Sequence, residues 1–132
     1  MPIGYVIDRT RRLVISTAEG RVSFDEIKAQ VDRLLDDSAF DPTFNQLIDC
    51  SEITNLDLSV DEAKMIGRLQ VFSQTSRHAF VATKPAVFGM ARLIQAYHEQ
   101  YSNAEARVFD ERDSALKWLG DPGSLLTSQQ PV

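Results

Sequence analysis

The sequence predicts one α/β domain in which a mostly parallel five-stranded sheet is connected by crossover helices. Short apolar runs rich in β-branched residues alternate with longer segments of helical periodicity, in the order ββαβαβαβα. A length of 132 residues, 43% of them hydrophobic and 25% charged, suits a single globular domain. Strands separated by helices favour parallel pairing with right-handed crossovers, whereas the first two strands, which adjoin, are expected to be antiparallel.

The first half of the chain is predicted to hold three strands and two helices. Residues 3–8 and 12–17 form two β-branched runs around a short polar turn, which indicates a hairpin. Ser23 and Glu26 have the spacing of a capping box and predict a helix over residues 23–38. A strand is expected at residues 44–50, with a connection at 51–58. A second capping box, Ser59 with Glu62, then predicts a helix to about residue 74.

The second half predicts two more strand–helix pairs. Residues 78–83 are nearly all apolar, as is typical of a buried central strand. Pro85 suits the first turn of a helix at residues 86–101, inside which Gly89 indicates close packing. A last strand is expected at 105–109, and Asp110 is expected to cap a final helix ending near Gly120. Residues 1–120 are thus predicted to form the domain, and residues 121–132 a mobile tail.

Composition excludes several classes of protein. A net charge of −5 argues against nucleic-acid binding. No apolar stretch approaches the ~20 residues that span a bilayer, so no integral membrane insertion is expected. Cys50 is the only cysteine and the start of the chain lacks the pattern of a signal peptide, which together predict a cytoplasmic protein.

The sequence predicts no catalytic residue, no metal site and no cofactor. Cys50 could act as a nucleophile only with a base such as His78 or His98, and no local motif joins them. The two histidines and the cysteine lack the paired spacing of a metal site. Glycine-rich phosphate loops are also missing. The protein is therefore not expected to be an enzyme.

A ligand site is predicted at the carboxyl ends of the third and fourth strands. Five residues there carry the prediction: Asp49, Ser51, Thr83, Lys84 and Arg92. In α/β sheets ligands bind at the carboxyl ends of strands, and a helix amino terminus attracts anions. Lys84 adds positive charge at that terminus, so a small anionic or amphipathic, lipid-like ligand is expected.

Three short motifs carry a family resemblance. The stretches Phe88–Arg92, Arg107–Asp110 and Ser114–Leu119 resemble the signature of SpoIIAA-like (STAS-like) proteins, which are small bacterial domains. The resemblance extends from about Tyr5 to Leu119. It implies a mostly parallel sheet related to that of anti-anti-sigma factors and, more distantly, to lipid-binding CRAL-TRIO domains.

The resemblance also implies a way of acting. Anti-anti-sigma factors work by protein–protein contact, and a serine at the start of the helix after their third strand is phosphorylated. Ser59, in the context Asp57-Leu58-Ser59-Val60, matches that position, although the glycine of the phosphorylated context is missing. The first hypothesis is therefore a non-catalytic binding or regulatory module whose partner is another protein or a second copy, as a homodimer. The alternative is the small-ligand binder described above.

Overall fold

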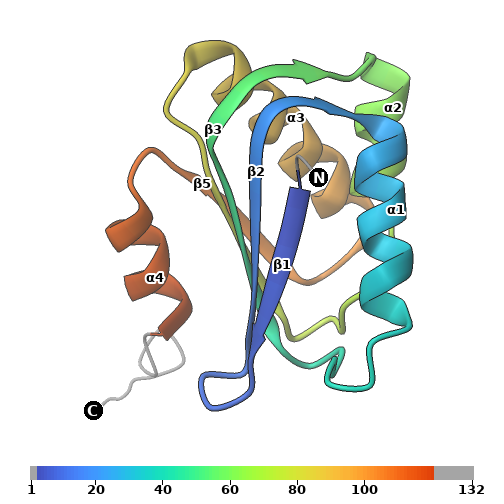
Figure 1. Cartoon of the computed structure of the whole chain (residues 1–132), viewed down its shortest axis with the longest axis vertical. Helices are drawn as coiled ribbons and strands as arrows, with labels where there is room; N and C mark the ends of the chain where they lie inside the picture. The colour runs from blue at the N-terminus through green and yellow to red at the C-terminus, as the bar shows by residue number, and fades with distance from the viewer. Residues whose placement is uncertain (1–2, 121–132) are drawn as a thin grey trace.

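The computed structural model describes residues 3–120, and these form five strands and four helices in the predicted order (Figure 1). The strands are β1 (Ile3–Asp8), β2 (Leu13–Ser23), β3 (Asn45–Asp57), β4 (Arg77–Val81) and β5 (Glu105–Phe109). The helices are α1 (Phe24–Leu35), α2 (Val60–Gly67), α3 (Pro85–Tyr101) and α4 (Arg112–Gly120). The predicted tail, residues 121–132, lies outside the described residues.

The sheet has the order β1-β2-β3-β4-β5, so each strand pairs with its neighbours in sequence. The β1–β2 pair is antiparallel and the other three pairs are parallel. Helices α1, α2 and α3 cover one face of the sheet, and α4 covers the other (Figure 1). The predicted α/β fold with a mostly parallel five-stranded sheet is therefore confirmed. No helix within residues 3–120 is long and apolar enough to cross a membrane.

Strands β2 and β3 are longer than the sequence predicts. The predicted strands ended at residues 17 and 50, whereas β2 continues to Ser23 and β3 to Asp57, still paired in parallel. Two register shifts interrupt the ladder, and Gly20 at the second has a φ of +68°, a conformation that glycine adopts without a steric penalty. Figure 1 shows both strands bending towards α1 and α2 in their last part.

Helix α2 is shorter than predicted because its last residue meets α3. A Cβ atom on Gly67 would lie 2.6 Å from the Tyr97 Cβ and 3.0 Å from the Ile94 carbonyl oxygen. The segment that follows is a loop held by the Pro42 carbonyl, which accepts bonds from the Ser73 N–H and the Ser76 hydroxyl. The close packing predicted at Gly89 is wrong, because nothing lies within 4 Å of a Cβ placed there.

The predicted capping boxes are present at two helices. At α2 the Ser59 hydroxyl accepts from the Glu62 N–H at 3.1 Å, and the Ser59 N–H donates to the Glu62 carboxylate at 2.9 Å. At α1 the Ser23 N–H donates to the Glu26 carboxylate at 2.9 Å, and the box is complete. The final helix begins at Arg112, one residue later than the predicted Asp110 cap implied.

Candidate ligand-binding cavity

A cavity of about 170 Å³ lies between the sheet and the three helices α1, α2 and α3. All five strands contribute to its walls, together with the loop that follows α2. Native interiors contain few voids larger than a water molecule, and aliphatic cavities of about 150 Å³ bind benzene-sized ligands. The space is therefore large enough for a small organic molecule.

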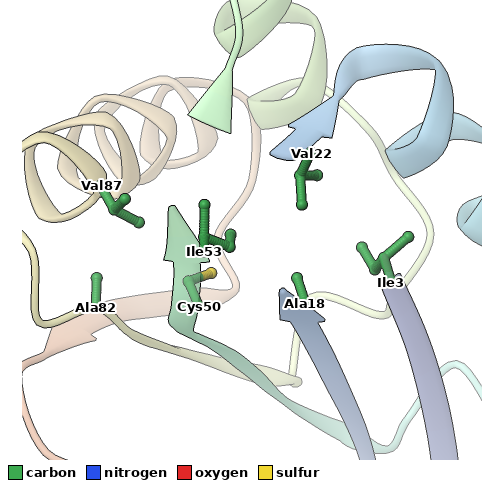
Figure 2. Close-up of a cluster of buried hydrophobic side chains, with 7 residues drawn as sticks. All are labelled: Ile3, Ala18, Val22, Cys50, Ile53, Ala82 and Val87. Atoms are coloured by element: carbon green, nitrogen blue, oxygen red, sulfur yellow. The ribbon is translucent and has the colours of Figure 1, made fainter. Parts of the chain in front are cut away.

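One end of the cavity is apolar. Figure 2 shows buried side chains from four elements converging there, and six of the seven drawn residues line the cavity: Ile3, Ala18, Val22, Cys50, Ile53 and Val87. Ile53 and Val22 come from the bent ends of β3 and β2, and Val87 comes from the first turn of α3. Such a surface gains free energy by contact with apolar atoms at about 25 cal/mol per Å² removed from water.

Polar side chains gather towards the amino ends of β3 and β4. Gln46 and His78 are the second residues of these strands and face each other in the sheet register. The His78 Nδ1 lies 2.9 Å from the Gln46 Oε1, so this ring nitrogen carries the hydrogen and donates it. A second pair is formed by Gln30 of α1, whose Nε2 donates to the Ser16 hydroxyl of β2 at 3.1 Å. All four side chains line the cavity.

Three buried polar atoms at this end have no hydrogen-bond partner in residues 3–120. They are the Gln30 Oε1, the His78 Nε2 and the His98 Nε2. Gln30 and His78 are each 7% exposed, and both residues line the cavity, as does His98. A buried polar group without a partner costs about 1–3 kcal/mol. These atoms are therefore free to bind a guest in the cavity.

The imidazole of His78 is neutral. Burial, with the neighbouring His98 as a smaller cause, lowers the pKa of His78 to about 3. The His78 ring packs edge-on against Phe72, at 4.9 Å between centroids, and against His98, at 5.1 Å. Because Asp, Glu, Lys and Arg are missing from the described lining, the cavity holds polar groups without fixed charge.

Cys50 is a wall of the cavity rather than a nucleophile. Burial, and to a lesser degree the nearby Asp49, raises the pKa of the Cys50 thiol to about 12. A thiol in that state contributes almost no thiolate at neutral pH, and the thiolate is the reactive form. Within residues 3–120 no group of three His, Cys, Asp or Glu side chains is placed to hold a metal ion. That the protein is not an enzyme stays a prediction.

Three of the five predicted ligand residues come together beside the carboxyl end of β4, although Asp49 and Ser51 lie within β3, which continues to Asp57 instead of ending at residue 50 as predicted. The Asp49 carboxylate accepts from the Ser51 hydroxyl at 2.6 Å, and the Lys84 ammonium donates to the Ser51 carbonyl at 3.1 Å. Arg112, which the sequence did not single out, binds the other Asp49 oxygen at 2.7 Å. Burial alone would raise the pKa of Asp49, but the bonds from Ser51 and Arg112 hold it below its usual value.

The other two predicted ligand residues are not tied into that cluster. Thr83 and Arg92 are exposed, and no hydrogen bond or ion pair within residues 3–120 joins either one to it. The described lining of the cavity includes none of the five predicted residues. Ser59 is exposed at the start of the helix after the third strand, with its hydroxyl engaged in the cap. The anion site and the phosphorylation at Ser59 stay predictions.

The sequence did not identify the polar end of the cavity, although it contained a signal. Side chains alternate across a strand, so Gln46 and Ile48 share a face, as do His78 and Phe80. A glutamine and a histidine on the inward face of predicted strands are unusual, because such groups must be hydrogen-bonded when buried. Gln30 interrupts the apolar face of α1 in the same way.

Comparisons with known proteins agree with this architecture. A search of curated proteins finds no match. Among solved structures, an uncharacterised protein with a SpoIIAA-like fold from Shewanella loihica PV-4 superposes with a TM-score of 0.57 and 19% sequence identity. That match covers 89% of this chain and 93% of the other, and at this identity it shows a shared fold. The SpoIIAA-like family pattern matches residues 13–120. The resemblance seen in the sequence is thus confirmed, and the chain belongs to the SpoIIAA-like family.

Proposed function

We propose that the protein binds a small, largely apolar ligand in the cavity between the sheet and helices α1–α3. The observation that supports this most directly is a largely apolar space of about 170 Å³ between the sheet and these helices. A ligand that fills the space recovers contacts that the protein alone leaves unmade.

The cavity lies elsewhere in the protein than the ligand site predicted at the strand ends. The strand-end cluster holds two cations, Lys84 and Arg112, and both are already engaged by protein oxygens. The cavity is neutral and faces the helices. An anion at Lys84 therefore remains a separate prediction, and titration with inorganic phosphate would test it: no difference between the wild type and Lys84→Gln would reject it.

Contact with a protein partner or a second copy also remains a prediction. Five large apolar side chains within residues 3–120 are exposed: Val6, Leu35, Val60, Met65 and Tyr101. They belong to four different elements, and Val60 and Met65 share α2. Light scattering coupled to gel filtration measures the oligomeric state. A strict monomer across a hundredfold range of concentration would reject the homodimer.

The cavity proposal is tested by filling the space from α3. Ala91 lines the cavity and is 2% exposed, whereas Ala96 lies on the same helix and is exposed. Ala91→Leu places three additional carbon atoms towards the cavity, and Ala96→Leu is the matched control. Benzene, as the probe, is titrated into each protein and followed by ¹H–¹⁵N spectra and thermal unfolding.

Benzene should shift the amide signals of cavity residues and raise the unfolding temperature in the wild type and in Ala96→Leu. Ala91→Leu should lose both responses while staying at least as stable as the wild type, because cavity filling commonly adds about 0.5–2 kcal/mol. The proposal fails if benzene leaves the wild-type spectra unchanged. It also fails if Ala91→Leu is destabilised by the strain of an already filled core.

A further inference from the structure

We infer that the ligand of this cavity is an uncharged hydroxyl compound, an alcohol or a phenol, whose hydroxyl hydrogen is donated to the His78 Nε2 or the Gln30 Oε1. This inference rests on the proposed function and goes further by naming the chemical class. It depends on which polar atoms of the cavity are free, whether each donates or accepts, and what charge surrounds them.

The free nitrogen of His78 is an acceptor. Its Nδ1 is paired with a carbonyl-type oxygen, the Gln46 Oε1, at 2.9 Å, and an oxygen of this kind only accepts. The hydrogen of the neutral ring therefore sits on Nδ1. The Nε2 keeps its lone pair, is buried, and has no partner within residues 3–120. Only a donor can satisfy it.

The free atom of Gln30 is an acceptor as well. The amide nitrogen of Gln30 donates to the Ser16 hydroxyl at 3.1 Å, which leaves the Oε1 buried and unpaired. Gln30 comes from α1 and His78 from β4, so the two acceptors lie on different walls of the same cavity. Two of the three unpaired atoms are therefore acceptors on opposite layers, and they favour a guest with a hydrogen to donate over one that only accepts. For the third, the His98 Nε2, no hydrogen bond within residues 3–120 fixes whether it donates or accepts.

The charge of the lining excludes ionised ligands. Neither a lysine or arginine nor an aspartate or glutamate is among the described residues that line the cavity. A buried carboxylate would find no cation, and an ammonium would find no anion, and an unpaired buried charge is costly. A carboxylic acid is ionised at neutral pH, so an alcohol or phenol is the hydroxyl compound that suits the site.

The carbon skeleton of such a ligand would contact the apolar part of the cavity. The cluster shown in Figure 2 forms the opposite part of the cavity, towards the bent ends of β2 and β3. The hydroxyl would lie at the amino ends of the strands, beside Gln46 and His78, and the carbon skeleton would lie against Ile53, Val22 and Val87. One orientation of an amphipathic, neutral molecule satisfies both ends.

Four related probes test the inference on the wild-type protein. Phenol, benzene, anisole and benzoate share one ring and differ in donor, acceptor and charge. A single buried hydrogen bond is worth about a factor of ten in affinity, so phenol should bind about ten-fold more tightly than benzene. Anisole, which only accepts, should bind no more tightly than benzene, and benzoate should not bind.

The outcomes separate this inference from the proposed function. If benzene does not bind, the proposed cavity function fails, and the hydroxyl inference, which rests on it, fails as well. If benzene, anisole and phenol bind equally, the cavity function stands but the hydroxyl inference is overturned, and internal water would satisfy the acceptors. Binding of benzoate with the affinity of phenol would overturn it too.

Two variants locate the acceptors. Gln30→Leu removes the free Oε1 while nearly conserving side-chain size, and His78→Leu removes the free Nε2. At least one of them should reduce the phenol-to-benzene ratio towards one, while benzene itself still binds. Gln100→Leu, an exposed change on α3, is the matched control and should leave the ratio at about ten. An unchanged ratio in both Gln30→Leu and His78→Leu would contradict the assignment even though the wild-type preference remained.

Discussion

Lowering the pH should destabilise this protein through one buried histidine, well before its carboxylates are protonated. Burial holds the pKa of His78 at about 3, against about 6.5 for an exposed histidine. Between these values the unfolded chain binds a proton that the folded chain does not. Stability therefore rises with pH across this range: the contribution of neutral His78 is complete above about pH 6.5 and is lost as the pH falls towards 3.

The size of the effect follows from the two pKa values. Each unit of difference corresponds to about 1.4 kcal/mol. Between pH 7 and pH 5 the unfolded histidine changes from mostly neutral to almost fully protonated, and the folded one stays neutral. Linkage then gives a loss of about 2 kcal/mol in the free energy of unfolding over this interval, with no discount for exposure because His78 is 7% exposed.

Between pH 7 and 5 the pH dependence of stability reports on His78 and hardly at all on the aspartates. The pKa values of four aspartates, at positions 8, 37, 41 and 49, are lowered in the folded protein. Their contribution is present above the unfolded value of about 3.9 and is lost only as the pH falls through their folded values. Above pH 5 they add almost no slope.

Urea unfolding at pH 7, 6 and 5, monitored by circular dichroism, measures the slope. His78→Asn keeps an N–H that can donate to Gln46 but cannot take up a proton, so its stability should be nearly constant over this range. His98→Asn, the matched control, keeps His78 and should keep most of the slope. A wild type whose stability is flat from pH 7 to 5, or a His78→Asn variant with the wild-type slope, would refute the buried neutral imidazole.

Two further predictions concern the helices. Gly67→Ala should destabilise the protein by about 1–3 kcal/mol in chemical unfolding, because the new methyl group meets the Tyr97 Cβ. Gly89→Ala adds its methyl group in open space within α3 and should stabilise the protein by up to about 1 kcal/mol. If Gly67→Ala were the more stable of the two variants, the packing of α2 on α3 would be contradicted. Ser59→Ala should lower the free energy of unfolding by about 1 kcal/mol through loss of the helix cap. Ser59→Asp retains a capping oxygen and should lower it little. Equal losses of stability in the two variants would mean that Ser59 does not cap α2. A changed oligomeric state in Ser59→Asp alone, measured by gel filtration, would support the phosphorylation predicted at this position.

Local patterns predicted the order of the strands and helices because each pattern depends only on residues that are close in sequence. The capping boxes at Ser23 and Ser59 depend on side chains three residues apart, and the structure contains both. The strands at residues 3–8 and 105–109 have the predicted bounds, since their apolar runs end where pairing ends. The predicted pairing directions also followed, because adjoining strands form an antiparallel hairpin and strands separated by a helix pair in parallel.

Where the structure differs from the sequence-based prediction, as in the lengths of α2 and β3, the cause is a tertiary contact. The apolar periodicity after Gly67 favours continued helix, but the close approach of α3 ends α2 and leaves a loop that lines the cavity. The polar segment after Cys50 was expected to be a connection, yet β2 supplies a parallel partner as far as Asp57. Arg112 joined the Asp49 cluster through a contact 63 residues apart, which no local pattern encodes.

The two ends of the sheet differ in the charge of their side chains, and this difference explains why the sequence pointed to the strand ends and not to the cavity. Charges are conspicuous in a sequence, so Lys84 and Arg92 directed attention to the carboxyl ends of the strands, where the charged cluster bonds mainly within itself. Uncharged polar residues in a sequence are easily interpreted as surface residues. Gln30, Gln46 and His78 look ordinary until three elements bring them to one cavity, where two acceptors are buried without partners. A neutral site of this kind can recognise a hydroxyl without attracting anions, and it is the inward position of uncharged polar side chains, more than the count of charges, that points to a ligand here.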